Sequence, residues 1–416
     1  MFGWEYPPHH SGGLGVACQG LVHALLDNEV HVCFVLPNSV PLNEKRVTIR
    51  FADRPILVGK KSAILRILAR ELQNPYLSSV EYEKKLSEFI KKGGKIIPRS
   101  LFDQVDHYAH MVDELFDEEG LDDVDIIHAH DWLCFPAGLR AKKLTGKPLV
   151  VHVHATEFDR SGGNSVNQRV YDLERYAMHN ADHVIAVSEL TRKIIIDRYG
   201  VDPAKVSVVH NGNTMMPKSP NFRFKYLFDY RKQNKKIVLY AGRITIQKGV
   251  DYFVQAAKRV LEYEKDVMFV VAGSGDMEGQ IKHAVHWMGI ADKFVFTGYY
   301  KMEEQQDLFS CADVVVMPSV SEPFGIIPLE SMSTGTPVIV SKQSGVSEVI
   351  SHALKVDFWD TDEIANKIIA VLRHPPLKET LSHEGKKQSK EITWDKAAKK
   401  TKKVYSSVTS KSKTKK

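Results

Sequence analysis

The sequence predicts an α/β protein made of two domains, each built on a parallel β-sheet. At 416 residues the chain is long for a single core, and two domains of roughly 200 residues each are the expected division. Short runs rich in valine and isoleucine alternate with helix-like stretches along most of the chain. Such runs, bounded by Gly, Pro or Asp, are typical of strands buried on both faces of a parallel sheet.

Each half of the chain supplies five predicted strands. Those of the first half lie within residues 30–37, 124–131, 147–157, 181–188 and 205–212, and those of the second within 235–243, 267–275, 293–300, 313–319 and 336–342. The stretch between the halves, residues 212–234, is rich in Asn, Pro and charged residues, which is typical of a surface linker. We therefore predict domains at residues 1–211 and 212–392.

Residues 45–95 break this alternation. They read as an inserted segment with helical character in residues 62–73 and 78–93. The sequence does not decide whether the insertion covers an acceptor site or only packs against the domain.

Composition and charge exclude several classes of protein. No run of 18 or more apolar residues is present, so we expect no membrane span. The cysteines, Cys18, Cys33, Cys134 and Cys311, are scattered without a CxxC pair, which favours reduced thiols and a cytoplasmic protein. Nine lysines and one aspartate lie between Trp394 and Lys416, so the basicity belongs to the C-terminus and nucleic-acid binding is not expected.

The last residues, 406–416, are of low complexity, and we predict a disordered basic tail there. Such a tail could make a peripheral contact with anionic lipid, but a solvated end is the favoured reading.

Polar residues collect where the predicted strands end, which is where open α/β sheets bind their ligands. Arg243 and Lys248 follow one strand within "AGRITIQKG" and could direct two cations at one diphosphate, or could be solvated surface charges. Glu322 and Glu330 flank "PFGIIPL", which predicts a loop with free amides followed by a helix that begins near Pro328. Carboxylates there could bind sugar hydroxyls, and the amides could bind phosphate.

The glycine cluster "SGGLG" near the front of the chain predicts a turn that lets backbone approach a bulky anion at a helix N-terminus, although a plain turn fits it equally well. Histidines recur in pairs, at His9/His10, His128/His130 and His152/His154. An HxH pair on one face of a strand could bind a metal, but no third ligand accompanies any pair at ligand spacing. A strand-end histidine that hydrogen-bonds a sugar is therefore favoured.

Taken in order, these motifs resemble family 4 glycosyltransferases of the GT-B fold, and among them the glycogen-synthase-like members of bacteria and archaea. The resemblance runs from Met1 to Tyr405 and rests on "SGGLG", "HAHDW", "HATEFDRSG", "NADHVIAVSE", "VVHNG", "AGRITIQKG", "AGSG", "SVSEPFGIIPLESMSTGTPVIVS" and "TWDKAAKKTKKVY". It implies two Rossmann-like domains that face each other across a deep cleft. It also implies that a final helix, residues 393–405, packs back on the first domain.

The resemblance further implies a role for each matching residue. Arg243 and Lys248 would hold the donor diphosphate and stabilise the leaving nucleotide, while Glu330 would bind the ribose. The transferred sugar would be held by Glu322 and by the amides of Phe324, Gly325 and Ile326, and main-chain or ring contacts of His154 would favour its transition state. The phosphates would be approached by Gly12 and Gly13. Glu322, His154, Arg243 and Lys248 would be the catalytic residues of a retaining enzyme that needs no metal or other cofactor.

The implied activity is transfer of a hexose, with glucose favoured, from UDP-glucose or ADP-glucose to a carbohydrate acceptor such as an α-glucan. Three alternatives stay open: a lipid-linked or small-molecule acceptor, with the lysine tail on a membrane; a catalytically silent glucan-binding protein; and a dinucleotide-dependent epimerase or oxidoreductase. The last ranks lowest because the chain lacks a GxGxxG fingerprint followed by an acidic ribose anchor.

Two departures from the glycogen-synthase pattern are visible. His10 stands where those enzymes often carry lysine, so a fixed positive charge is absent from that position. Relatives also carry apolar residues before the stretch that matches "MFGWE". We therefore expect the first strand to be short or absent, as in a gene model with an internal start.

Overall fold

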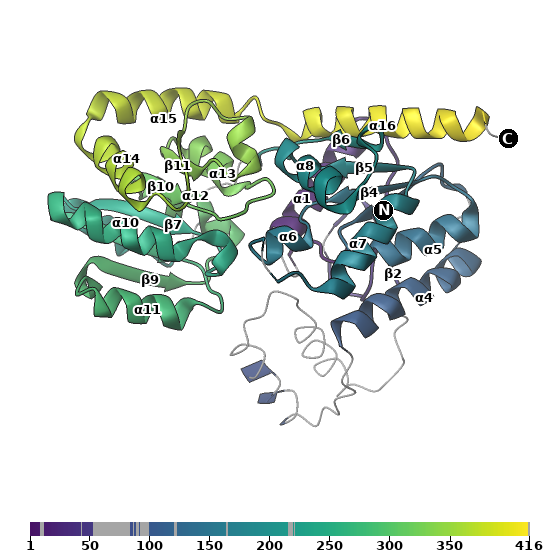
Figure 1. The fold of residues 1–416 in the computed structure, drawn as a ribbon, viewed down its shortest axis with the longest axis horizontal. Coiled ribbons are helices and arrows are strands. Elements are labelled where there is room, and N and C mark those ends of the chain that lie inside the picture. The colour runs from purple at the N-terminus through teal and green to yellow at the C-terminus, as the bar shows by residue number, and fades with distance from the viewer. Residues whose placement is uncertain are drawn as a thin grey trace.

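Two parallel β-sheets, each covered by helices on both faces, make up the molecule (Figure 1). The structure is a computed structural model that describes residues 1–414 except 9–11, 43, 53–83, 86, 89–90, 92–99, 120–122, 164, 215–218 and 220. Most of the predicted insertion at residues 45–95 therefore lies outside the described residues.

The front of the chain forms the centre of the first sheet. Phe2 pairs in parallel with Val35 on one side and with Ala129 on the other, and its N–H donates to the His128 carbonyl at 2.8 Å. The first strand is thus short, as expected, and it joins two ladders of parallel strands. These strands are β1 (Cys33–Leu36), β2 (Thr48–Phe51), β3 (Ile127–His130), β4 (Leu149–Val153), β5 (His183–Ala186) and β6 (Val206–Val208).

Alternate residues of these strands enter two different cores. Val150 and Ile185 face α1 and α16, whereas their neighbours Val151 and Val184 face α4, α5, α7 and α8. This division explains the Val/Ile-rich runs, since both faces of the sheet are buried. The helices are α1 (Gly13–Asp27), α4 (Leu101–Glu119), α5 (Phe135–Thr145), α6 (Glu157–Arg160), α7 (Gln168–Asn180), α8 (Glu189–Tyr199) and α16 (Trp394–Thr414), with a 3₁₀ turn η2 (Pro203–Lys205).

The second sheet has the order β12-β11-β10-β7-β8-β9, and all its strands are parallel. They are β7 (Lys236–Ala241), β8 (Val267–Ala272), β9 (Phe294–Gly298), β10 (Val314–Met317), β11 (Val338–Ser341) and β12 (Leu354–Val356). One face packs on α10 (Val250–Tyr263), α11 (Glu278–Trp287) and α14 (Thr361–Arg373), and the other on α9 (Leu227–Lys232), α12 (Gln305–Ser310) and α13 (Ile327–Thr334).

The remaining elements of the second domain are α15 (Pro375–Ser389) and four short 3₁₀ helices: η3 (Ile246–Lys248), η4 (Ala291–Lys293), η5 (Met302–Glu304) and η6 (Gly345–Glu348). All ten predicted strands are present. The structure adds β2 and β12, which the sequence reading missed, each at an edge of its sheet.

The predicted surface linker is wrong in part. Phe222, Phe224 and Leu227 are each at most 5% exposed and belong to the core between the second sheet and α13. The segment is therefore a packed part of the second domain. Arg223 fastens it further by an ion pair with Glu304, whose carboxyl has its pKa lowered to about 2 by that guanidinium.

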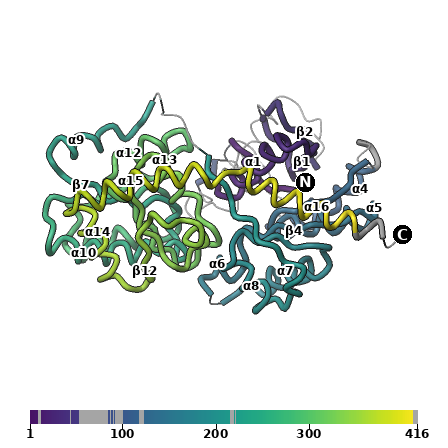
Figure 2. Tube along the Cα trace, turned by 90° about the horizontal axis from the view of Figure 1, so that it is seen from above, coloured from purple at the N-terminus to yellow at the C-terminus, as the bar shows by residue number. Residues whose placement is uncertain are grey.

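The predicted disordered tail is also corrected, because α16 continues as helix to Thr414. Val404, Tyr405 and Val408 are buried at helical spacing, so the apolar face that packs on α1 extends past residue 405. The exposed face carries the lysines Lys396, Lys399, Lys400, Lys402 and Lys403. Figure 2 shows the chain passing from α15 over the second domain to α16 along the first.

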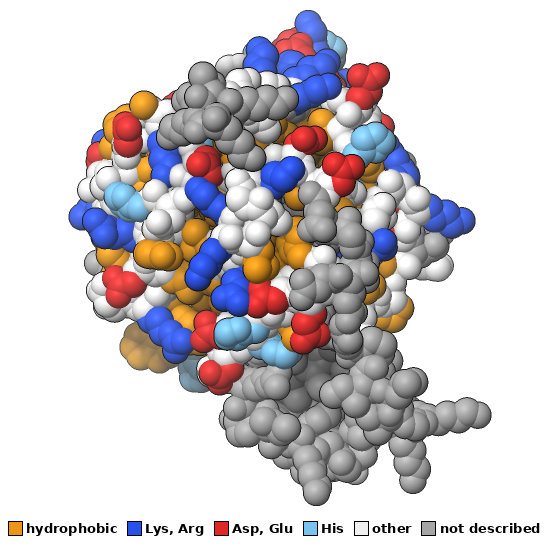
Figure 3. All heavy atoms as spheres, turned by 90° about the vertical axis from the view of Figure 1, so that its right-hand side faces the viewer, with side chains coloured by type: hydrophobic (Ala, Val, Ile, Leu, Met, Phe, Trp, Pro, Cys, Tyr) orange, Lys and Arg blue, Asp and Glu red, His pale blue; other side chains and the backbone are white. Residues whose placement is uncertain are grey.

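Basic and acidic side chains are interspersed over the end of the molecule seen in Figure 3. Among the described residues, no helix is both long and apolar enough to cross a lipid bilayer.

The order of the strands in each sheet indicates where a ligand site would lie. In the second sheet the chain order reverses between β7 and β10, and in the first it reverses between Phe2 and β3. Crevices at the carboxyl ends of strands at such switch points are where open α/β sheets bind ligands. The residues that follow these strand ends are Glu5, Asp131, Arg243 and Glu322.

Glu5 forms an internal cap at the start of α1. Its carboxylate is 2% exposed and accepts hydrogen bonds from the amides of Gly15 at 3.0 Å and Gly12 at 3.5 Å. A carboxylate suits the positive end of a helix dipole. Burial nevertheless dominates and raises the pKa of Glu5 to about 8, while the charge of Arg243 opposes this rise.

The chain passes between the domains twice, near Gly212 and near Thr393, and the two passages pair through a parallel bridge between Asn213 and Thr393. A Cβ on Gly212 would lie 2.1 Å from the Trp394 backbone nitrogen, so we expect Gly212→Ala to lower the free energy of unfolding by about 1–3 kcal/mol. Chemical denaturation measures this. Gly279→Ala in α11 is the control, because its Cβ would meet no atom within 4 Å, and it should stabilise by about 0.5–1 kcal/mol. Equal stability of Gly212→Ala and wild type would contradict this close approach.

Glu5 should make folding stability depend on pH. Between its ordinary pKa of 4.5 and its folded pKa of about 8, the unfolded chain has lost a proton that the folded chain keeps, so rising pH favours unfolding. We expect Glu5→Gln to gain stability relative to wild type as pH rises from about 5 to about 8. Urea unfolding at a series of pH values measures this, with the exposed Glu391→Gln as control. A Glu5→Gln difference that does not change with pH would refute the raised pKa.

Candidate active site

A short ion pair occupies the switch point of the second sheet. Lys248, at the end of η3, lies with its Nζ 2.5 Å from Oε2 of Glu322, which follows β10. Glu322 is only 6% exposed, and the Ser319 hydroxyl lies 3.4 Å from the same oxygen. The structure thus brings together two residues that the sequence analysis had assigned to the diphosphate and to the sugar.

Glycines hold these strand ends close together. A Cβ on Gly249 would lie 1.9 Å from the Pro318 carbonyl oxygen, and one on Gly273 would lie 1.8 Å from that of Gly242. All three glycines also have φ between +64° and +144°, which other residues rarely adopt. These contacts place η3 against the end of β10 and so fix Lys248 beside Glu322.

The loop after Glu322 leads to α13 with unpaired amides. No described group accepts a hydrogen bond from the backbone N–H of Phe324, Gly325 or Ile326. Phe324 is 2% exposed and anchors the loop, while Gly325 has φ +93°. Helix α13 begins at Ile327 with Pro328 in its first turn, as predicted, so free amides and the positive end of the dipole coincide there.

Glu330 lies in the first turn of α13 and is 6% exposed. Burial raises the pKa of its carboxyl to about 7. No hydrogen bond to this carboxylate from another described side chain is present. Glu330 therefore retains acceptor capacity toward a ligand, as its predicted ribose contact requires.

The first domain contributes the start of α1. Gly12 is the N-cap in an extended conformation, and Gly13 is exposed with no atom within 4 Å of the position of a Cβ. His10, which stands where relatives often have lysine, lies outside the described residues. Since the charge of Arg243 lowers the pKa of Glu5, the second domain's cation lies close to the start of α1.

His154 is half-buried, and its ring is turned into the first domain. Its Nε2 lies 3.0 Å from Nδ1 of His130, and its ring stacks on His152 at 4.3 Å. Its backbone N–H donates to Asp131 at 2.6 Å. Burial lowers the pKa of the His154 ring to about 3, so the ring is neutral at physiological pH.

Polar contacts join the two domains beside the site. Ser321 donates to Asp159 at 2.6 Å, and Glu348 of η6 accepts from the first amides of α8 at 2.8 and 2.9 Å. Glu348 also lies 2.9 Å from His210. Ile326 packs against the cores of both domains. These contacts hold the strand ends of the two sheets toward each other.

Two residues of the site were missed by the sequence analysis. Asp131 ends β3 with φ +59°, a strained value for a residue with a side chain, and burial raises its pKa to about 7. The signal was its place in "HAHDW", directly after a strand. Glu5 was missed because its partners are the amides of Gly12 and Gly15, which no sequence pattern links to it.

Two groups of buried or half-buried side chains could be considered as metal ligands among the described residues. Their ligand atoms lie within 4.8 Å of one another: His128, His130 and His152 in one group, and Cys18, His130 and His154 in the other. A ring nitrogen binds metal within its ring plane. The planes of the first group lie 18–30° apart in stacked or tilted pairs, so their lone pairs do not converge. In the second group, His130 and His154 already bond each other.

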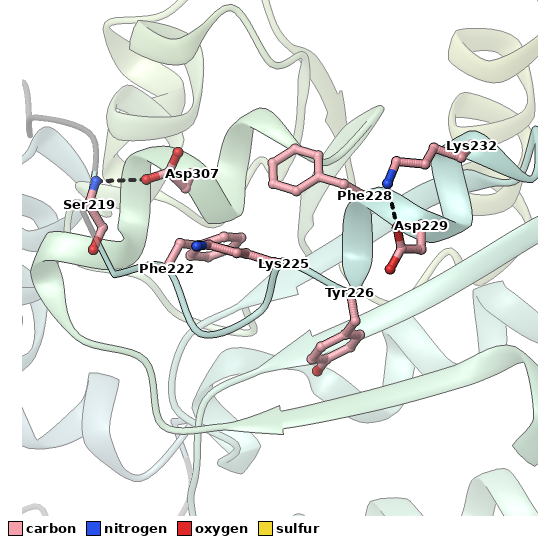
Figure 4. Close-up of a pocket in the computed structure, with 8 residues that line it drawn as sticks. All are labelled: Ser219, Phe222, Lys225, Tyr226, Phe228, Asp229, Lys232 and Asp307. Carbon is pink, nitrogen blue, oxygen red and sulfur yellow. Dashed lines mark hydrogen bonds and ion pairs between the residues drawn. The ribbon is translucent and has the colours of Figure 1, made fainter.

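A separate open pocket lies away from these residues on the second domain. Its volume is about 450 Å³, and it is lined by residues of the 219–232 segment and by Asp307 (Figure 4). In Figure 4, Asp307 bonds the Ser219 backbone and Lys232 pairs with Asp229, so its charged groups are mostly satisfied internally. It contains none of the predicted site residues.

Comparisons with known proteins match both halves of the chain. A family model described as Glycosyltransferase Family 4 matches residues 81–213, and one described as Glycosyl transferases group 1 matches residues 222–388. An uncharacterised glycosyltransferase of Methanocaldococcus jannaschii is 31% identical over 422 aligned positions that cover 97% of each chain. Alpha-maltose-1-phosphate synthase of Mycolicibacterium smegmatis is 31% identical over 68% of this chain and 79% of the relative.

The fold is shared with solved structures. The Anabaena protein HepE, solved in complex with UDP and glucose, superposes with a TM-score of 0.68 over 98% of both chains at 16% identity. At that identity the likeness concerns the fold alone. The family models, the archaeal relative and the shared architecture together agree with the resemblance that the motifs predicted. The chain therefore belongs to the family 4 glycosyltransferases and has their two-domain GT-B fold.

Proposed function

We propose that the protein is a retaining hexosyltransferase that moves glucose from UDP-glucose or ADP-glucose to a carbohydrate acceptor, with an α-glucan as the first candidate. The observation that carries this proposal is the Lys248–Glu322 pair beside the unpaired amides that precede α13. The matched relative that makes maltose 1-phosphate and the HepE complex with UDP and glucose support a glucosyl donor.

The ion pair suggests how a donor would be received. A diphosphate brings negative charge for Lys248, and a sugar brings hydroxyl donors for Glu322. Each member of the pair can therefore exchange its protein partner for a substrate partner, and neither charge is left unpaired in a buried site. Arg243 would add a second cation for the diphosphate, and the amides of Gly12 and Gly13 would approach it from the other domain.

This machinery requires no metal ion. Lysine, arginine and two helix N-termini supply the positive charge that a leaving nucleoside diphosphate needs as the bond to the sugar breaks. Glu330, in the first turn of α13, would accept hydrogen bonds from the ribose hydroxyls. His154 would contribute beside the transferred sugar.

The direct test is release of nucleoside diphosphate by the purified protein from UDP-glucose, ADP-glucose and GDP-mannose, each with and without glycogen and with EDTA present. We expect glycogen-dependent release from one glucose donor that EDTA does not abolish. Release that does not depend on glycogen would move the acceptor to a lipid-linked or small molecule. Silence with every donor would refute the proposal in favour of a non-catalytic glucan-binding protein.

Removing either member of the ion pair should impair turnover. We expect Lys248→Ala and Glu322→Ala each to lower kcat by roughly 10²–10³-fold, because each loses one electrostatic contact at the transition state. The matched control is Lys282→Ala, which breaks the exposed pair between Lys282 and Glu278 on α11 and should leave kcat unchanged. Wild-type turnover in either site variant would contradict the assignment.

A further inference from the structure

Four histidines stand together on one face of β3 and β4, in the layer between the first sheet and the helices α1 and α16. They are His128 and His130 on β3 and His152 and His154 on β4, and the register pairs His130 with His152. Their rings form two stacks, with centroids 4.4 Å apart for His128 and His130 and 4.3 Å apart for His152 and His154. Only His154, just beyond the end of β4, belongs to the proposed site.

The hydrogen bonds of these histidines are unequal. His130 Nδ1 lies 3.0 Å from His154 Nε2, and His128 Nδ1 lies 2.5 Å from the Tyr405 hydroxyl of α16. By contrast, both ring nitrogens of His152 lack a partner among the described residues, although this side chain is only 1% exposed. His130 therefore differs from His152 in one respect that matters to His154: it bonds the ring, whereas His152 only stacks on it.

The bond between His130 and His154 joins two neutral rings. Burial lowers the pKa of both imidazoles, so neither is charged at physiological pH. A neutral imidazole has one N–H donor and one acceptor nitrogen. Nε2 of His130 is buried without a partner among the described residues, and a buried N–H without an acceptor is costlier than an unpaired lone pair. His130 therefore carries its proton on Nδ1 and donates it to Nε2 of His154, which places the proton of His154 on Nδ1.

We propose that His130 is a positioning residue that fixes the ring orientation and the tautomer of His154, and so leaves Nδ1 as the one ring nitrogen of His154 with a defined hydrogen-bonding character toward a substrate. This inference rests on the proposed function in assigning His154 to the donor site. It adds a residue to that site that never contacts substrate. It also accounts for a buried polar residue on a strand whose neighbour Ala129 packs in an apolar core.

The chain offers a matched set of variants for a test. His130→Phe keeps an aromatic ring in the stack with His128 but removes the bond to His154, while His130→Asn returns a polar atom near the position of Nδ1. His152→Phe is the control, because it replaces an equally buried ring that stacks on His154 but makes no hydrogen bond. Thermal unfolding of each variant reports whether it folds.

The first readout is independent of activity. Nitrogen-15 spectra of histidine-labelled protein, with the His154 signals assigned by difference from His154→Gln, distinguish the two neutral tautomers. We expect one tautomer of His154 in wild type and in His152→Phe, a mixture in His130→Phe, and a single tautomer again in His130→Asn. An unchanged single tautomer in His130→Phe would overturn the proposal.

The second readout is donor turnover. We expect His130→Phe to lower kcat by about tenfold with KM for the nucleotide sugar nearly unchanged, the size of one hydrogen bond, and His130→Asn to restore most of it. An equal loss in His152→Phe would mean that packing of the histidine layer, and not the bond, is responsible, and would refute a positioning role. A wild-type protein inactive with every donor would remove the proposed function, whereas the spectra would still decide whether His130 holds the ring.

Discussion

The buried ion pair of Lys248 and Glu322 is the interaction around which the candidate site of the second domain is arranged. Taking two charges out of water costs more free energy than a surface pair returns, so such a pair persists only where the surrounding fold holds it in place. Here that support is backbone geometry: Gly249 against the Pro318 carbonyl and Gly273 against Gly242 allow the ends of β7, β8 and β10 to approach more closely than any residue with a side chain would permit. The glycines that follow these strands therefore allow Lys248 and Glu322 to lie side by side at the switch point of the sheet.

The switch point of the first sheet carries no such ion pair among the described residues. It carries two buried carboxyls, Glu5 and Asp131, each held by backbone amides and each with its pKa raised by burial. Arg243 from the second domain offsets part of the cost at Glu5. Because its folded pKa is about 8, Glu5 keeps its proton at neutral pH, so the first-domain edge meets Arg243 with a largely uncharged carboxyl.

Much of this could be read from the sequence, and the limits have physical causes. All ten predicted strands are present because burial on both faces leaves an unmistakable run of branched apolar residues, whereas the edge strands β2, "TIRF", and β12, "LKV", mix polar with apolar residues and gave no such signal. The 212–234 segment was misread since its Pro and charges outnumber Phe222, Phe224 and Leu227, yet those three side chains decide where it packs. The tail was misread in the same way, because Val404 and Val408 stand among lysines and serines at helical spacing.

For the site as well, the sequence indicated which residues take part but not which of them contact each other. The positions of the strand ends led us to predict Arg243, Lys248, Glu322 and Glu330 as site residues. They did not indicate that Lys248 and Glu322 bond each other or that the His154 ring faces His130, because both facts depend on distances across the sheet. Beside the hydrogen bonds of Ser321 and Glu348, the contacts between the domains include apolar packing, because Val187 of the first domain lies in the core cluster of the second and Ile326 contacts the cores of both. Separation of the domains would therefore expose apolar surface as well as polar groups. A ligand that binds both edges, with negative charge for Lys248 and Arg243, favours the arrangement in which both edges contact it by its differential affinity for that arrangement.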